Sequence, residues 1–223
     1  MQLKEGYFWR MSTDEGRTWG PRRTVPVRRT AIDHNNPWKG EIMGMFLCDK
    51  PSIINGWVYM AFQKTWDAAG ETVPREAFLL RSKNFLECNG EGATWETLPK
   101  GEHGLQALEG RLGEEPHVLQ VSGSRLLVFW RTQVGKLAAA YSDDWGETFG
   151  KPFWYTYGGP KASLMLNPRG AFTPKKLFDG SFVMLYYNNG STDREGYVGR
   201  RVLWITVGRT SPCGKEILWS QPE

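Results

Sequence analysis

Several segments of the sequence combine arginines with carboxylate, amide, imidazole and phenol side chains. The candidate ligand-binding residues are Arg28, Arg29, Asn36, Arg131, Arg169, Asn188 and Arg200. The candidate catalytic residues are Asp33, Glu41, His117 and Tyr187. An arginine fork binds a carboxylate through two parallel hydrogen bonds, and a positioned carboxylate or imidazole can transfer protons. The combination indicates chemistry on an anionic ligand, such as an acidic sugar.

Each candidate also has a purely structural interpretation. The arginines could be solvated surface charges, Asp33 could cap its own loop, and Glu41 could pair with a neighbouring arginine. His117 opens a predicted inner strand and could be a core histidine, while Tyr187 could be simple strand packing. The elements that position these residues must therefore be found.

A repeated turn organises the chain. Two segments follow the pattern S-x-D-x-G-x-T-aromatic, and each comes after an apolar, strand-like run. The repeated residues are Ser12, Asp14, Gly16 and Trp19 in the first segment and Ser142, Asp144, Gly146 and Phe149 in the second. The aspartate can accept hydrogen bonds from turn amides, the glycine allows a backbone conformation closed to other residues, and the aromatic enters the next strand. Residues 81–95 and 214–222 carry degenerate copies.

The segments between these turns predict an all-β fold of four-stranded antiparallel blades, with strands A to D from the channel outward. The predicted strands are 50–54, 57–62, 77–81 and 94–97, then 117–121, 125–130, 136–141 and 148–153, then 170–176, 181–187, 201–207 and 216–219. Residues 1–223 thus form a single partial propeller, with a half blade at 1–21 and full blades at 45–99, 115–153 and 168–223. With about three and a half blades, we expect an open arc with exposed apolar side faces, its remaining blades missing from this sequence.

Composition excludes several other classes. The formal charge is +4 without a run of lysines or arginines, so no nucleic-acid partner is expected. No stretch approaches the roughly 20 apolar residues of a membrane span. The three cysteines lack metal-ligand spacing, so we expect neither a metal nor a cofactor. Residues 1–10 show no signal-peptide pattern, which leaves the compartment open, although a secreted or periplasmic full protein is compatible with the sequence.

The two repeats resemble the Asp boxes, or bacterial neuraminidase repeats, of the sialidase (neuraminidase) superfamily. Residues 28–33 with 35–37, and the closing residues 219–223, resemble bacterial exo-α-sialidase-like proteins, and the resemblance covers nearly the whole chain. It implies a six-bladed propeller, and a glycoside hydrolase that removes a terminal, acidic sugar from a glycan. Sialidases use three arginines, the first in an Arg-Ile-Pro segment, together with a Tyr–Glu pair and an Asp. This sequence contains no Arg-Ile-Pro.

Propeller geometry places the long D–A and B–C connections on the face opposite the repeated turns, and functional groups concentrate on such connections. We expect Arg28 or Arg29, Asp33, His117, Arg131 and Arg169 to converge there at the channel mouth. Two alternatives remain. One is a polysaccharide lyase for uronic-acid glycans, with His117 as its base. The other is a non-catalytic glycan- or protein-binding propeller, which is favoured if no two of Asp33, Glu41, Glu115 and Asp193 meet around an arginine.

Overall fold

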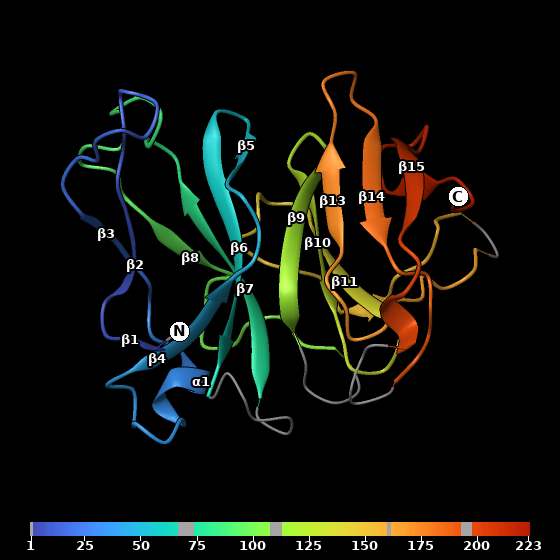
Figure 1. Cartoon of the computed structure of the whole chain (residues 1–223), viewed down its shortest axis with the longest axis horizontal. Coiled ribbons are helices and arrows are strands. Elements are labelled where there is room, and N and C mark those ends of the chain that lie inside the picture. The colour runs from blue at the N-terminus through green and yellow to red at the C-terminus, as the bar shows by residue number, and fades with distance from the viewer. Residues whose placement is uncertain (1, 67–73, 108–112, 160–161, 193–197) are drawn as a thin grey trace.

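The protein is an all-β chain whose antiparallel sheets stand side by side in an arc (Figure 1). The computed structural model describes residues 2–66, 74–107, 113–159, 162–192 and 198–223. The sheets do not close into a ring, and the predicted all-β fold of four-stranded antiparallel blades is confirmed. Among the described residues, no helix is long and apolar enough to cross a membrane.

The N-terminal half of the chain forms two sheets. A two-stranded sheet pairs β2 (Gly6–Trp9) with β3 (Arg23–Pro26). The next sheet contains β4 (Met43–Leu47), β5 (Ser52–Ile54), β6 (Trp57–Thr65), β7 (Arg75–Ser82) and β8 (Glu96–Leu98). Its inner strand is divided, because β4 and β5 pair with successive parts of β6. The short β1 (Gln2–Leu3), which the sequence did not predict, pairs with β4.

The C-terminal half forms two four-stranded sheets with simple up-and-down order. The first contains β9 (Glu114–Ser122), β10 (Arg125–Arg131), β11 (Leu137–Ser142) and β12 (Phe153–Trp154). The second contains β13 (Thr173–Lys176), β14 (Phe182–Tyr186), β15 (Trp204–Thr210) and β16 (Ile217–Trp219). The one α-helix in the described residues is the single turn α1 (Ala31–His34), and the 3₁₀ turn η1 (Val198–Arg200) precedes β15.

The outermost strands begin later than the sequence suggested. The predicted strand at 148–153 is wrong for its first residues, because Thr148 is hydrogen-bonded back to Asp144 and Gly150 donates to the Tyr141 carbonyl. These bonds keep the chain in the turn until Phe153, where β12 starts. The consensus turn is therefore longer than the loop assumed from the sequence pattern.

The two consensus turns share one hydrogen-bond pattern. In the second, the Asp144 carboxylate accepts from the Thr148 amide at 2.9 Å and from the Thr148 hydroxyl at 2.6 Å. The Ser142 hydroxyl donates to Asp144 and accepts from the Gly146 amide, both at 2.8 Å. Gly146 has a φ of 92°, a conformation that favours glycine. Ser12 and Asp14 make the equivalent bonds to Gly16 and Thr18 in the first turn.

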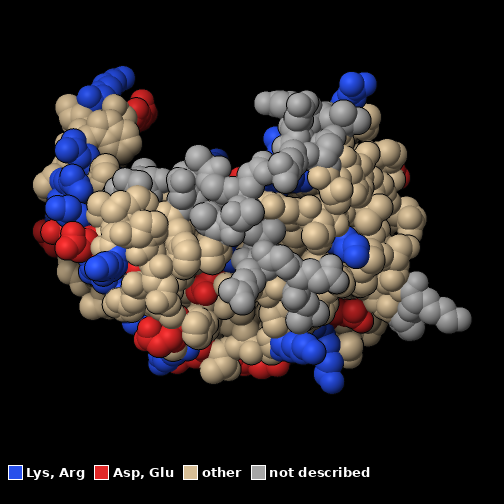
Figure 2. All heavy atoms as spheres, turned by 90° about the horizontal axis from the view of Figure 1, so that it is seen from below, with Lys and Arg blue, Asp and Glu red and all other residues tan. Residues whose placement is uncertain are grey.

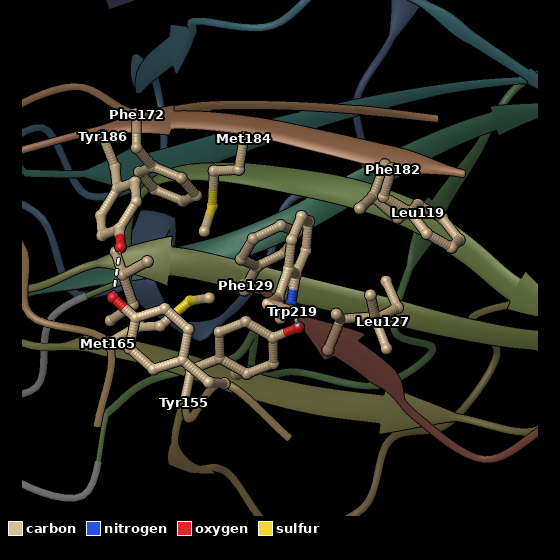
Figure 3. Packing of buried hydrophobic residues seen from close by; sticks show 14 of the residues in the cluster. Leu119, Leu127, Phe129, Tyr155, Met165, Phe172, Phe182, Met184, Tyr186 and Trp219 are labelled. Carbon is tan, nitrogen blue, oxygen red and sulfur yellow. Dashed lines mark hydrogen bonds between the residues drawn. The ribbon is translucent and has the colours of Figure 1, made fainter. Parts of the chain in front are cut away.

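Apolar side chains fill the spaces between neighbouring sheets. Between the last two sheets, Phe129 of β10 packs against Phe172 and Tyr155, and the Trp219 indole donates to the Tyr155 hydroxyl at 2.7 Å (Figure 3). A fully buried apolar side chain stabilises the fold by about 1.5–3 kcal/mol. These apolar clusters between the sheets fix each sheet relative to the next and thereby hold the inner strands in place.

The outer side of the last sheet has no covering layer within the described chain. Leu185 of β14 and its cross-strand partner Ile205 of β15 are 39% and 42% exposed, and Val207 is 46% exposed. At the other limb, Lys and Arg side chains gather along the edge on the left of Figure 2, the side on which Figure 1 places β2 and β3. The arc therefore ends in an apolar face at β14–β15 and a basic edge at the N-terminal sheet.

The connections fall into two sets at opposite ends of the strands. The β9–β10 turn contacts consensus-type turns, because Ser124 donates to the Asp143 carbonyl and Ser122 to the Gly214 carbonyl, both at 2.6 Å. Turns of this set lie at the top of Figure 1, whereas α1 and η1 lie at the bottom. The Ala31 amide of α1 donates to the Glu102 carbonyl at 2.9 Å, so long connections meet on the second face.

Candidate functional site

The start of the inner strand β9 carries a buried carboxylate held by two arginines. Glu114 lies 2.9 Å from Nη1 of Arg75 and 3.0 Å from Nη2 of Arg131, and all three side chains are at least four-fifths buried. The Gln133 side-chain amide also donates to Glu114 at 3.0 Å. Removing one partner of such a group would leave a buried charge uncompensated, which costs about 3–5 kcal/mol. Glu114 therefore fixes the orientation of Arg131.

The next residue, Glu115, is also ion-paired to Arg131, but its side chain is more exposed to solvent than that of Glu114. Its Oε1 lies 3.1 Å from Nη2 of Arg131, and its side chain is 23% exposed. Its backbone amide donates to the Gln63 side chain at 2.7 Å, and its φ is 46°. A non-glycine residue in this region of φ costs about 1–3 kcal/mol and is enriched at functional sites. The β9–β10 pairing also shifts register between Phe129 and Arg131, as strands often do beside active sites.

Besides Nη1 of Arg75 and Oε2 of Glu114, which are held in ion pairs, two further atoms of this cluster make no hydrogen bond. Oε2 of Glu115 and Nε of Arg131 are buried and lack a hydrogen-bond partner among the described residues. Buried polar atoms in folded proteins are nearly always satisfied. A donor on a cation and an acceptor on the anion paired with it match a ligand that offers both a carboxylate and a hydroxyl.

His117 lies two residues further along β9 in a separate charged group. Its Nδ1 is 2.9 Å from Oδ2 of Asp49, an ion-pair contact without the alignment of a good hydrogen bond. Lys175 of β13 lies 2.8 Å from the other oxygen of Asp49. Burial opposes ionisation of Asp49, but the nearby His117 and Lys175 outweigh it and lower its pKa. The His117 ring packs against Phe172, with centroids 4.6 Å apart, and is 3% exposed.

Asp33 and its neighbours form a distinct buried unit around α1. The Asp33 carboxylate is ion-paired to Lys64 of β6 and accepts from the Thr30 amide at 2.9 Å, closing a capping box at the helix start. Both charged side chains are at most 2% exposed. Burial lowers the pKa of Lys64, although Asp33 opposes this shift. Asp33 thus occupies the structural position that its loop-capping interpretation described.

The arginines and polar residues around α1 bind backbone carbonyls. Arg28 donates to the carbonyls of residues 97, 99 and 101, and Arg29 to those of residues 4, 40 and 41. Asn36 is buried and bridges the loop from residue 36 to residue 42. Glu41 is exposed. The contacts of this group thus join it to the loops that surround it.

A third group lies around the start of β13. Tyr187 packs against Gly170, where a Cβ would come within 2.8 Å of the phenol ring, and Arg200 is exposed beside it. Asn188 accepts from the Tyr157 hydroxyl at 3.3 Å, and Arg169 is half-buried. The structure thus brings Tyr187 and Arg200 together over Gly170. Asp193 and Arg194, which share this connection, lie outside the described residues.

Of the residues proposed to converge, His117 and Arg131 lie on the paired strands β9 and β10. Sequence reasoning did not single out Asp49, Lys64, Arg75 or Lys175. Lys64 left a signal, because it follows the apolar run at residues 57–62 within one short, strand-like segment, and the whole strand is buried almost throughout. A lysine in such a run requires a buried partner. In the described part of the chain, no group of three or more His, Cys, Asp or Glu residues could hold a metal ion.

Comparison with solved structures identifies the architecture. The chain aligns with NanB sialidase from Streptococcus pneumoniae at a TM-score of 0.55 and 17% identity, covering 96% of this chain and 27% of that one. It aligns with a leech intramolecular trans-sialidase at a TM-score of 0.59 and 16% identity, covering 96% and 28%. The fold is sialidase-like. The intramolecular trans-sialidase of Ruminococcus gnavus aligns at a TM-score of 0.56 and 17% identity, covering 95% and 38%.

The sialidase-like chain spans about a third or less of the length of several of these enzymes. A protein of unknown function from Dyadobacter fermentans is also similar, at a TM-score of 0.52 and 16% identity, covering 98% of this chain and 64% of that one. No protein-family model matches the chain, and no curated protein matches it in sequence. The likeness therefore concerns the fold, and function has to be argued from the site.

Proposed function

We propose that this sialidase-like chain supplies one wall of the active site of a glycoside hydrolase that removes a terminal acidic sugar from a glycan. The proposal depends on one observation: Arg131 is forked between Glu114 and Glu115 at the start of an inner strand, with Nε of Arg131 and Oε2 of Glu115 unused. This arrangement offers a fixed cation beside a partly exposed carboxylate. Both belong to the start of β9 and the end of β10, where we propose that the sugar binds.

In the proposed reaction, Arg131 binds the carboxylate of the sugar, because a guanidinium donates from several nitrogens in one plane. Glu114 and Arg75 act as positioning residues, since they hold Arg131 without needing to touch the sugar. Glu115 accepts or donates the proton that bond cleavage at the anomeric carbon requires. The strained backbone of Glu115 aims its carboxylate where the relaxed strand conformation would not.

A test compares Glu115→Gln with Glu87→Gln, an exposed glutamate as matched control, in the full-length protein. Aryl glycosides of sialic acid, glucuronic acid, galacturonic acid and galactose are the substrates. We expect wild type and the control to cleave at least one acidic glycoside, and Glu115→Gln to lower kcat by about 100-fold or more with little change in KM. Equal activity of Glu115→Gln and the control would reject the role of Glu115.

Glycan binding without catalysis is the second candidate, and a specific observation favours it. Asp33 is buried against Lys64, and Glu41 is exposed. The carboxylate that shares Arg131 with Glu115 is that of its neighbour Glu114, and not that of Asp33 or Glu41. This candidate predicts saturable binding of acidic sugars that Arg131→Ala weakens, with no product released from any glycoside. The kinetic test above therefore separates the two candidates.

A further inference from the structure

A groove of about 430 Å³ runs along the inner strands of three neighbouring sheets. Its walls come from β5, the middle of β9, and β13, and Figure 1 shows β9 between β6 and β13. The lining residues precede the tight strand-connecting turns, so the groove lies toward the face of the consensus turns. It lies further along β9 than Glu115, and none of its lining residues belongs to the Glu114–Glu115–Arg131 group. Its volume falls within the usual range of small-ligand sites, about 300–1,000 Å³.

The charge of the groove has one sign. Three lysines, Lys50, Lys175 and Lys176, line it, and no aspartate or glutamate does. Asp49, at the edge of the groove, is already 2.9 Å from His117 and 2.8 Å from Lys175. Among the described residues, Lys50 and Lys176 therefore have no carboxylate partner.

The environment of Lys176 adds a second observation. Its ammonium donates to the Gln120 carbonyl at 3.3 Å and lies 5.5 Å from the centre of the Phe182 ring. The Lys176 side chain is exposed overall, but partial desolvation of its ammonium by the neighbouring strands lowers its pKa. A lysine in this setting gains from any anion that enters the groove, since the anion would supply the missing charge.

We propose that this groove is a second ligand site, separate from the proposed active site, that binds an oxyanion through Lys50 and Lys176. Phosphate, sulfate and carboxylate groups share the required chemistry, because a lysine ammonium binds each as a compact point charge. Lys175 stays with Asp49 and borders the bound anion. The apolar lining from Ile53 and Ile54 accommodates the uncharged part of the ligand.

The test uses the full-length protein with inorganic phosphate and glucuronic acid as separate probes, measured by isothermal titration calorimetry. Lys50→Gln/Lys176→Gln is compared with Lys39→Gln/Lys215→Gln, which removes the same charge from exposed lysines outside the groove. We expect the groove variant to weaken binding of at least one probe tenfold or more, and the control to stay within about twofold. The probe that is lost identifies phosphate-type or carboxylate-type ligands.

Amine labelling of the wild-type protein gives an independent readout that does not depend on the folding of a variant. Bound phosphate or glucuronic acid should slow acetylation of Lys50 and Lys176, relative to Lys39 and Lys215, at least severalfold. The proposal is overturned if the groove variant binds both probes as tightly as the control. It is equally overturned if neither probe protects Lys50 and Lys176 selectively.

Discussion

Replacing Asp33 by Asn should destabilise the protein rather than disable its chemistry. The change leaves the buried ammonium of Lys64 facing a neutral amide, while one oxygen still accepts from Thr30. Loss of one partner from a buried ion pair costs about 3–5 kcal/mol. Because the amide oxygen keeps part of the capping box, we expect about 3 kcal/mol, the lower end of that range. Urea denaturation of the full-length protein, followed by tryptophan fluorescence, measures the loss.

The pH dependence gives this prediction a distinct signature. Burial lowers the pKa of Lys64 below its unfolded value, so between the two values the unfolded chain binds more protons and stability rises with pH. Removing the Asp33 charge lowers the pKa of Lys64 further. The free energy of unfolding should therefore increase more steeply from neutral to alkaline pH in Asp33→Asn than in wild type. Asp33→Leu/Lys64→Met, which removes both charges, should abolish this slope.

The result that would refute this reasoning is equally specific. If Asp33→Asn unfolds at the wild-type urea concentration at every pH but turns over an acidic glycoside about 100-fold more slowly, Asp33 acts on substrate. The buried pair with Lys64 would then not describe the working protein. A stability loss accompanied by unchanged kcat in the folded fraction supports the structural role.

Three further changes test the turns, the inter-sheet ties and the core. Asp144→Ala removes acceptors for the Thr148 amide and hydroxyl, and should lower the free energy of unfolding by about 1–3 kcal/mol in urea titrations. Hydrogen bonds from Lys100 and Arg81 lower the pKa of Glu147 to about 2. The stabilisation by ionised Glu147 is therefore complete above pH about 4.5 and is lost as the pH falls to about 2. Glu147→Gln should reduce the loss of unfolding free energy over this acidic range. Trp219→Phe leaves the buried Tyr155 hydroxyl without its donor and should cost about 1–3 kcal/mol by the same measurement.

The fold could be predicted from the sequence because the hydrogen bonds of the repeated turn join residues that are close together in the chain. Asp144, Gly146 and Thr148 interact within one turn, so their order in the chain already encodes the hydrogen bonds. The alternation of apolar residues around them then gives the strands. The first residues of the outer strands could not be predicted in the same way. The second turn extends to residue 152, and only the structure shows that strand pairing resumes at Phe153.

The candidate site depended on contacts between sheets, which sequence order does not encode. His117 was singled out, but Asp49 and Lys175, its charged neighbours, come from the inner strands of two other sheets. Arg131 was also singled out, yet the sequence did not pair it with Glu114 or Glu115. Asp33 was a candidate for acid–base chemistry or for capping its loop, and its buried partner Lys64 could not be inferred because it lies 31 residues away in the chain.

The proposed function assigns recognition of an acidic sugar to Arg131 and reaction with it to Glu115. A crystal structure of the full-length protein, soaked with the acidic sugar that it cleaves or binds, tests it most directly. We predict the sugar carboxylate within about 3 Å of the Arg131 guanidinium, and the anomeric carbon directed toward the Glu115 carboxylate. If the sugar carboxylate bound to other residues while Arg131 stayed ion-paired only to Glu114 and Glu115, the assignment would be contradicted.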